Sequence, residues 1–266
     1  MASSSKPTKL SVNLGRDRLE AQVKDDTIIL DHRFKISAVR LKQALREKDT
    51  TVFFLDETGK FYKIAFYRGE RYYKLRNVGE NLAPTLEISG VHMHNILGTD
   101  PWVDARRKVE AINVKKYEKV LDLCTGLGYT ASIAALRGAT VVTIEKDPAV
   151  LEIAEYNPWS YMLSNSNVSI ILGDATEIIE DFPSGVFDAA IHDPPRLRLA
   201  GELYSLEFYK KLRRVLRRGG LLFHYTGWPG KHQGLNIQVG IARRLRAANY
   251  SILQVFKGYG IVAQAL

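Results

Sequence analysis

Residues 119–130 read Lys119-Val-Leu-Asp-Leu-Cys-Thr-Gly-Leu-Gly-Tyr-Thr130. The first part, Val120–Leu123, is a short apolar run of the kind that a buried parallel strand shows. Residues 124–128 interrupt this run with two glycines, and helix-compatible residues resume at Tyr129. Glycine allows a sharp backbone turn and a close approach to a ligand. The order of strand, glycine turn and helix therefore predicts a ligand site at the carboxyl edge of a sheet.

Three more apolar runs follow, and each ends in a polar or glycine-bearing corner. These runs and corners are Thr140–Ile144 with Glu145, Ser169–Leu172 with Gly173-Asp174-Ala175, and Phe187–Ile191 with His192-Asp193-Pro194-Pro195. An acid that ends the second strand is placed to accept hydrogen bonds from a ribose diol. The ordered set of four strand ends, with helical spacers between them, predicts an α/β fold that binds a nucleotide.

This pattern resembles the class I S-adenosylmethionine-dependent methyltransferases over roughly residues 85–266. The first motif of that family reads acid-x-Gly-x-Gly-x-Gly, and Asp122–Gly128 matches it with Cys124 in place of the first glycine. The resemblance implies a Rossmann-like α/β sheet, mostly parallel with an antiparallel last strand, and S-adenosylmethionine as the cofactor. The residues that it implies for cofactor binding are Asp122, Cys124, Thr125, Gly126, Gly128, Tyr129, Glu145, Lys146, Gly173, Asp174, Ala175 and Asp193.

A nicotinamide-binding Rossmann protein is an alternative explanation of the glycine turn. That class favours a third glycine near position 131, where this chain has Ala131, although alanine is tolerated there. The choice between the two classes therefore depends on the corner Asp193-Pro194-Pro195.

That corner, with Arg196, resembles the Asp/Asn-Pro-Pro-aromatic motif of methyltransferases that act on adenine N6, cytosine N4 or guanine N2. Such an amine is a poor nucleophile because its lone pair is delocalised into the ring. A side-chain oxygen of Asp193 and the carbonyl of Pro194 would accept its two N–H bonds and direct the lone pair towards the methyl group. The prolines would keep the turn rigid. We take Asp193, Pro194, Pro195 and Arg196 as the catalytic candidates; a plain strand end is the alternative.

Arg196 stands where that motif has Tyr, Phe or Trp, and a guanidinium plane can also stack on a base. Carbon-5 methylation of pyrimidines needs a cysteine nucleophile, and the lone Cys124 lies in the predicted cofactor turn, so we do not expect that chemistry. Asp188 is expected to be structural. His192 and His224 are candidates to line the acceptor pocket.

Residues 1–80 predict a small basic α+β module ahead of a methyltransferase domain at 81–266. Residues 37–48 predict a helix that Ser37 caps. The turn signal Asp56-Glu-Thr-Gly59 predicts a hairpin between Val52–Leu55 and Phe61–Tyr67.

The module also interleaves aromatic residues with Lys and Arg, as in Lys60–Lys63 and Tyr67–Arg76. Surfaces that bind single-stranded RNA use this combination to stack bases and neutralise phosphates. A hairpin with an aromatic inner face and a charged outer face is the alternative. His92 and His94 have no further ligands at matching spacing, so we expect a structural or substrate-facing pair and no metal.

The C-terminal third predicts the remaining elements of the fold. Leu203–Leu216 reads as a helix that Gly219-Gly220 ends, and Leu221–Tyr225 reads as the fifth strand. A further helix is expected at Gln233–Ala248. The resemblance implies that Ser251–Phe256 and Gly260–Leu266 form the closing antiparallel pair.

The composition favours a polyanionic partner, because the 266 residues carry a formal net charge of +9 and the pI is about 9.5. The N-terminus has no signal-peptide pattern, and no run approaches the ~18 apolar residues of a membrane span. We therefore expect a cytoplasmic protein that does not bind a membrane.

The whole chain resembles a group of predicted archaeal methyltransferases. Together with the motifs, this implies an RNA methyltransferase that acts on a base exocyclic amine, with cytidine N4 in ribosomal RNA as the favoured target. One alternative is a polyamine aminopropyltransferase using decarboxylated S-adenosylmethionine, which would need extra acidic residues to hold a polycation. The other is a non-catalytic RNA-binding protein, which the acids at positions 122, 145, 174 and 193 disfavour.

Overall fold

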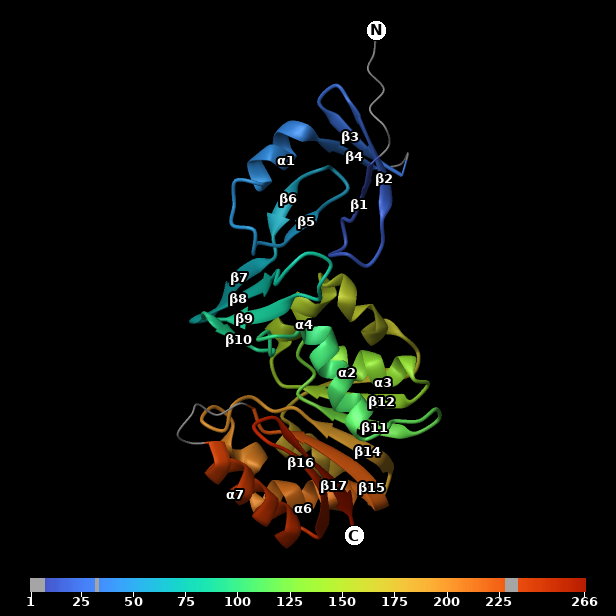
Figure 1. Cartoon of the computed structure of the whole chain (residues 1–266), viewed down its shortest axis with the longest axis vertical. Helices are drawn as coiled ribbons and strands as arrows, with labels where there is room; N and C mark the ends of the chain where they lie inside the picture. Colours follow the sequence, from blue (N-terminus) through green and yellow to red (C-terminus); the bar gives the residue numbers. More distant parts are fainter. Residues whose placement is uncertain (1–7, 32–33, 228–233) are drawn as a thin grey trace. The chain divides into compact units, whose positions relative to one another are not determined.

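The computed structural model describes residues 8–31, 34–227 and 234–266 and forms two compact units (Figure 1). The first unit comprises the chain up to Trp102 together with Glu152–Trp159, and the second comprises Val103–Leu151 and Ser160–Leu266. In the described part of the chain, no helix is long and apolar enough to cross a membrane.

The second unit is built on a seven-stranded sheet with the order β13-β12-β11-β14-β15-β17-β16. Its strands are β11 (Lys119–Leu123), β12 (Thr140–Glu145), β13 (Val168–Leu172), β14 (Phe187–His192), β15 (Leu216–Tyr225), β16 (Tyr250–Phe256) and β17 (Gly260–Ala265). Strands β11 to β15 pair in parallel, and β17 is antiparallel to both β15 and β16. The predicted fold class is therefore confirmed. The chain reverses its direction across the sheet at β11, where α/β folds bind ligands beyond the strand ends.

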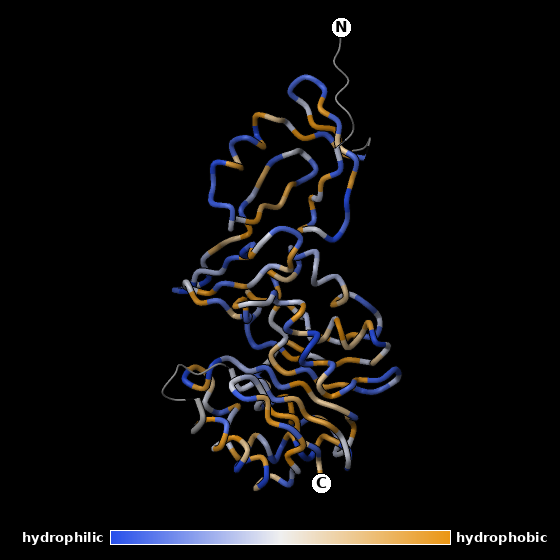
Figure 2. Tube along the Cα trace, in the orientation of Figure 1, coloured by the Kyte–Doolittle hydropathy of each residue, from blue (hydrophilic) through white to orange (hydrophobic). Residues whose placement is uncertain are grey.

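Helices flank this sheet, and its central strands are buried on both faces. The helices are α2 (Pro101–Ala111), α3 (Tyr129–Leu136), α4 (Pro148–Glu155), α5 (Ala175–Ile178), α6 (Leu206–Val215) and α7 (Gly234–Ala247). All residues of β11 after Lys119 are buried, and Figure 2 shows the central strands as mostly hydrophobic. Such a sheet needs cover on both faces, and α6 and α7 supply one of the covering layers through a shared core cluster.

The region before β15 differs from the prediction. A short 3-10 turn (Gly201–Tyr204) precedes α6, and the Ser205 hydroxyl caps α6 by accepting a bond from the Phe208 N–H at 3.0 Å. The helix ends at Val215, and Leu216 already pairs with Phe187. The glycine pair at 219–220 therefore does not end the helix. It lies in a register irregularity of β15, where Gly219 has a φ of +81°.

The first unit contains two four-stranded antiparallel sheets and a hairpin. One sheet orders β1 (Thr8–Leu10), β2 (Leu19–Lys24), β3 (Thr27–Leu30) and β4 (Phe34–Ser37); the other orders β10 (Val91–His92), β9 (Thr85–Ile88), β8 (Arg71–Arg76) and β7 (Ala65–Arg68). The hairpin pairs β5 (Phe53–Leu55) with β6 (Phe61–Lys63), and α1 spans Ala38–Ala44.

The helix and the hairpin turn expected in this unit are present, although α1 ends at Ala44 and the prediction extended to residue 48. Ser37 caps α1, and the Asp56 carboxylate accepts bonds from the N–H groups of Thr58 and Lys60, both at 2.9 Å, in the hairpin turn. The expected second strand of the hairpin is split at Ile64, because β6 and β7 belong to different sheets. The expected boundary at residue 80 falls between β8 and β9, which pair in one sheet, so β9 and β10 extend this unit.

Candidate active site

The loop between β11 and α3 has a left-handed backbone at three positions. Cys124, Gly126 and Gly128 have φ values of 70°, 56° and 72°. Left-handed backbone favours glycine, which explains why the methyltransferase motif has glycine where this chain has Cys124. The N–H groups of Cys124 and Thr125 both donate to the Ile144 carbonyl at 3.0 Å, which ties the loop to the end of β12.

Glu145, the last residue of β12, is held by backbone donors from two loops. Its carboxylate accepts bonds from the N–H groups of Gly126 at 2.9 Å and of Lys146 and Asp147 at 3.0 Å. Burial raises the pKa of Glu145, and these three bonds oppose the shift. A carboxylate has about four lone-pair sites, so Glu145 can still accept a bond from a ribose hydroxyl.

Asp174 follows β13 and caps α5. Its carboxylate accepts bonds from the backbone N–H and the hydroxyl of Thr176, at 2.9 and 2.7 Å, and pairs with the Lys146 ammonium at 2.6 Å. Burial raises the pKa of Asp174, but the bonds from Lys146 and Thr176 outweigh it and lower the pKa to about 2. Gly173 donates its N–H to the Glu145 carbonyl at 2.8 Å, which joins this corner to the previous one.

Asp122 is fully buried beneath the glycine loop. Its Oδ2 accepts a bond from the Thr143 hydroxyl at 2.7 Å, and the Thr125 and Thr143 hydroxyls lie 2.6 Å apart. Burial raises the pKa of Asp122 to about 7, against the hydroxyl bonds from Thr130 and Thr143 that lower it. Tyr129 and Ala175 are buried as well.

These residues fit S-adenosylmethionine, which carries positive charge on its sulfonium and amino groups. Four acids, Asp122, Glu145, Asp174 and Asp193, lie in or just after the ends of β11, β12, β13 and β14. The four strands are neighbours in the sheet, so their carboxyl ends meet at one edge. The left-handed loop adds a backbone that a ligand can approach closely.

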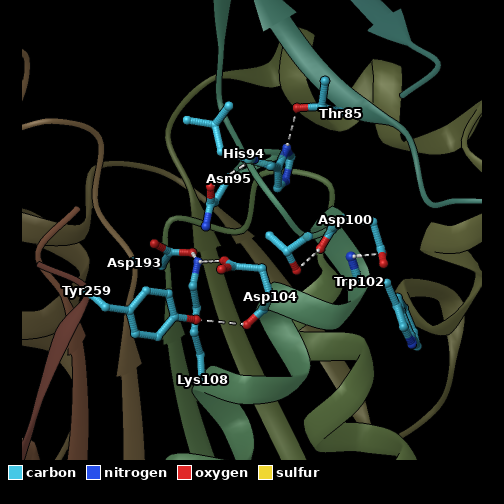
Figure 3. A network of polar contacts seen from close by, with 11 residues as sticks. Thr85, His94, Asn95, Asp100, Trp102, Asp104, Lys108, Asp193 and Tyr259 are labelled. Atoms are coloured by element: carbon cyan, nitrogen blue, oxygen red, sulfur yellow. Dashed lines mark hydrogen bonds and ion pairs between the residues drawn. The ribbon is translucent and has the colours of Figure 1, made fainter. Parts of the chain in front are cut away.

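Asp193 is held by a buried lysine from α2 (Figure 3). The Lys108 ammonium lies 2.6 Å from Asp193 Oδ2 and 2.9 Å from Asp104 Oδ2, and 4.1 Å from the centre of the Tyr225 ring. Burial lowers the pKa of Lys108, but the carboxylates of Asp193 and Asp104 outweigh it and raise the pKa above its usual range. The Asp193 side chain remains 24% exposed, and the described residues give its Oδ1 no hydrogen bond.

The two prolines after Asp193 shape a turn in which one carbonyl stays available. Pro194 is buried, and none of the hydrogen bonds found among the described residues ends on its carbonyl. The Pro195 carbonyl accepts a bond from the Tyr204 hydroxyl at 2.9 Å, and the Arg196 carbonyl accepts one from the Leu199 N–H at 2.7 Å. The side chains of Pro195 and Arg196 are exposed at this corner.

The sequence did not reveal Lys108 and Asp104 as site residues. Their spacing of four along one helix face was visible, but the same face also carries the buried Ala105 and Val109 and reads as core. Their link to Asp193, 85 residues from Lys108, depends on how α2 packs within the second unit.

The expectation that His192 and His224 line the acceptor pocket is wrong, because both are fully buried. The ring centres lie 4.5 Å apart on adjacent strands, among aromatic side chains. His192 Nε2 lies 2.9 Å from the Leu203 carbonyl and must donate to it. Burial lowers the pKa of His192 to about 4, so the ring is neutral at pH 7 and its Nδ1, unpartnered among the described residues, carries no proton. Asp188 is structural as predicted, since it accepts bonds from the Lys119 N–H at 2.7 Å and Arg217 at 2.6 Å.

His192 gives a testable pH dependence of stability. Burial lowers its pKa from 6.5 to about 4, so as the pH falls the unfolded chain takes up a proton before the folded protein does. The stabilisation is present above pH 6.5 and is lost by about pH 4, a loss of about 3 kcal/mol. The pKa of Asp122 is raised, so its effect on stability changes with pH in the opposite direction. We therefore compare wild type with His192→Gln by urea unfolding, because Asp122 is present in both proteins. As the pH falls from 6.5 to 4, the free energy of unfolding of the variant should rise by about 3 kcal/mol relative to that of wild type. A difference between the two proteins that does not change with pH would contradict the buried neutral ring.

His92 and His94 both have partners inside the first unit. His94 Nδ1 lies 3.1 Å from the Thr85 hydroxyl, and His92 Nε2 lies 3.5 Å from a Glu87 oxygen. Over the ranges that the structure describes, no three His, Cys, Asp or Glu side chains are grouped to hold a metal ion.

Comparison with known proteins identifies similarity over this part of the chain. A family described as a methyltransferase domain matches residues 120–220. The uncharacterized protein MJ1233 of Methanocaldococcus jannaschii is 41% identical over 97% of this chain and 90% of its own length. This chain belongs to the same family as MJ1233. The matched methyltransferase domain contains all four acids at the strand ends.

Two other similarities cover a smaller part of this chain or show only a shared fold. A putative ribosomal RNA large subunit methyltransferase of M. jannaschii, MJ1653, is 33% identical over 31% of this chain and 22% of its own length. The crystal structure of spermidine synthase from Thermotoga maritima matches with a TM-score of 0.58 and 16% identity, over 76% of this chain and 71% of that one. The latter shows that the fold is shared.

Glu145→Ala should weaken S-adenosylmethionine binding by about 1.5–3 kcal/mol, because it removes a charged acceptor for the ribose. Asp174→Ala should cost less, since Lys146 and Thr176 already occupy that carboxylate. Isothermal titration calorimetry compares the two variants. Unchanged affinity in Glu145→Ala would show that the ribose is held elsewhere.

Proposed function

We propose that this methyltransferase transfers a methyl group to the exocyclic amine of an RNA base, with cytidine N4 in ribosomal RNA as the favoured target. The observation that carries the proposal is the pair of acceptors at the end of β14. Asp193 Oδ1 and the Pro194 carbonyl have no hydrogen bond among the described residues, and they belong to consecutive residues of one turn.

Two adjacent acceptors suit an amine that has two N–H bonds. S-adenosylmethionine supplies a methyl group on an excellent leaving group, so the protein chiefly has to orient the acceptor. Asp193 and Pro194 would each accept one amine N–H and turn the nitrogen lone pair out of conjugation. The ring of Pro195 limits the backbone freedom of this turn. Arg196, exposed beside it, offers a planar guanidinium on which the base can stack.

Carbon-5 methylation of a pyrimidine fits this site poorly. Cys124 is the only cysteine of the chain. Burial raises its pKa well above the usual value, and the carboxylates of Glu145 and Asp193 raise it further. The thiolate that would attack the base is therefore disfavoured.

Aminopropyl transfer to a polyamine is the second candidate, and the shared fold of spermidine synthase is the observation in its favour. The acceptor there would be a polycation. In this chain Lys108 neutralises part of the negative charge of Asp193, and Arg196 is exposed at the same corner. Both cations would repel a polyamine, so we favour the RNA base.

The first unit offers a surface that suits RNA. Residues 1–80 hold 17 Lys and Arg against 11 Asp and Glu, so they carry +6 of the net +9. On the β7–β8 hairpin, Tyr67 pairs with Tyr72 at 4.8 Å between ring centres, and the Tyr67 side chain is 73% exposed. The inner face of the hairpin has its own aromatic residue, the buried Tyr73. The core of the hairpin therefore does not require the exposed Tyr67 ring, and its pairing with the half-buried Tyr72 favours base stacking.

Replacing Tyr67 and Tyr72 together with alanine should lower RNA affinity about 5- to 150-fold, the range for losing one stacked base. Cofactor affinity should not change. Tyr117→Ala is the matched control, because Tyr117 is an exposed tyrosine of the second unit. Filter binding at two salt concentrations measures the effect. Equal RNA affinity in wild type, the double variant and Tyr117→Ala would show that the hairpin is not part of the RNA-binding surface.

Methylation of unmodified ribosomal RNA transcripts by the purified protein tests the proposal. With methyl-labelled S-adenosylmethionine, nucleoside mass spectrometry should find the label on cytidine N4. A parallel reaction with decarboxylated S-adenosylmethionine and putrescine should give no spermidine. Label on a ring carbon, or spermidine formation, would overturn the proposal. The proposal includes a cytoplasmic location, where ribosomal RNA would be reached.

A further inference from the structure

Lys108 occupies a closed position behind Asp193. Its side chain is 5% exposed, and its ammonium lies against two carboxylates and the Tyr225 ring. An ammonium has three donors and no acceptor, so any atom that faces it closely must accept. The oxygen of residue 193 that points at Lys108 is therefore committed to that bond.

The other oxygen of Asp193 has a separate task under the proposed function. It must accept an N–H bond of the base amine, so residue 193 has to present an acceptor in two directions. An ionised carboxylate accepts through both oxygens, whereas an amide has one acceptor and one NH₂ donor. An asparagine here would turn its NH₂ either towards Lys108 or towards the amine, and both arrangements set donor against donor.

We propose that Lys108 is a positioning residue that makes a carboxylate obligatory at position 193. It binds Oδ2, fixes the plane of the carboxylate and leaves Oδ1 facing the acceptor amine. The related motif is found with either Asp or Asn, and this chain is restricted to Asp by the lysine from α2. The inference rests on the proposed function, because it assigns the free oxygen to a base amine.

Four variants of the full-length protein test the inference: Asp193→Asn, Lys108→Met, the double variant, and Asp104→Asn as the matched control. Asp104 pairs with the same ammonium at 2.9 Å, so Asp104→Asn removes the same charge from the same cluster. Single-turnover methylation rates are measured at saturating RNA. The concentration of folded sites comes from calorimetric titration with the cofactor.

Asp193→Asn should lose about a hundredfold in rate constant, comparable to losing one oriented charge-stabilising group. Asp104→Asn should lose only a few-fold, because its amide oxygen can still accept from Lys108 and the buried Asp104 does not contact the base amine in the proposed arrangement. The double variant should be about tenfold faster than Asp193→Asn, since without Lys108 the amide oxygen is free to face the base. The apparent RNA affinity should change little in any of them.

A rate near wild type in Asp193→Asn, or no recovery in the double variant, would overturn the inference. If Lys108→Met and the double variant do not fold, the contrast between Asp193→Asn and Asp104→Asn decides; equal losses would refute it. Wild-type protein that methylates no base amine would instead overturn the proposed function, and the inference with it.

Discussion

Replacing Asp193 with alanine is expected to lower the methylation rate constant by about a hundredfold or more. The carboxylate accepts an N–H bond that strengthens as the amine nitrogen rehybridises, so it serves the transition state more than the ground state. The fold should survive, because the Lys108 ammonium keeps Asp104 as a partner at 2.9 Å. Single-turnover assays on ribosomal RNA measure the loss.

Cofactor affinity separates this effect from damage to the site. Asp193 lies on the acceptor side of the methyl group in the proposed arrangement, so calorimetry should give nearly wild-type S-adenosylmethionine affinity. Glu145→Ala should show the opposite pattern, with weaker cofactor binding. A wild-type methylation rate in Asp193→Ala would show that Asp193 only ends a strand and takes no part in the reaction.

Gly128→Ala should destabilise the protein by about 2–5 kcal/mol. Its φ of +72° costs an L-residue about 1–2 kcal/mol. An added Cβ would also lie 2.5 Å from the Leu163 side chain, and such overpacking typically costs about 1–3 kcal/mol. Gly128 caps α3 next to the loop that Glu145 holds, so cofactor binding should weaken too.

Gly185→Ala is the control for backbone strain alone. Gly185 has a similar φ of +69°, but its nearest neighbour to an added Cβ is the Arg217 Cα at an ordinary 3.7 Å. This variant should lose only about 1–2 kcal/mol. Urea unfolding compares the two variants, and equal losses would show that Leu163 moves aside without cost.

Much of the second unit could be predicted because its signals are local. The apolar runs of β11, β12 and β14 are continuous, since helices cover both faces, and each is followed by its glycine or acid. The carboxyl ends of parallel strands meet at one edge, so the sequence order was enough to bring Glu145, Asp174 and Asp193 together. Their contacts with the cofactor and the base stay predictions.

Other features could not be predicted because they depend on distant contacts. Lys108 looked like one more charged residue of a helix, and its role appears only when α2 packs against β14 and β15. The polar rings of His192 and His224 suggested a pocket, yet adjacent strands place them together in the core. The expected second hairpin strand, Phe61–Tyr67, is split at Ile64 because its two parts pair in different sheets. Nothing in the sequence of this run indicates the split.

Nucleoside mass spectrometry of ribosomal RNA from a strain that lacks the gene tests amine methylation of RNA most directly. We predict that an N4-methylated cytidine present in the parent strain is missing from the deletion strain. Wild-type protein should restore it, and Asp193→Ala should not. An unchanged set of modified nucleosides in the deletion strain would contradict the proposed function.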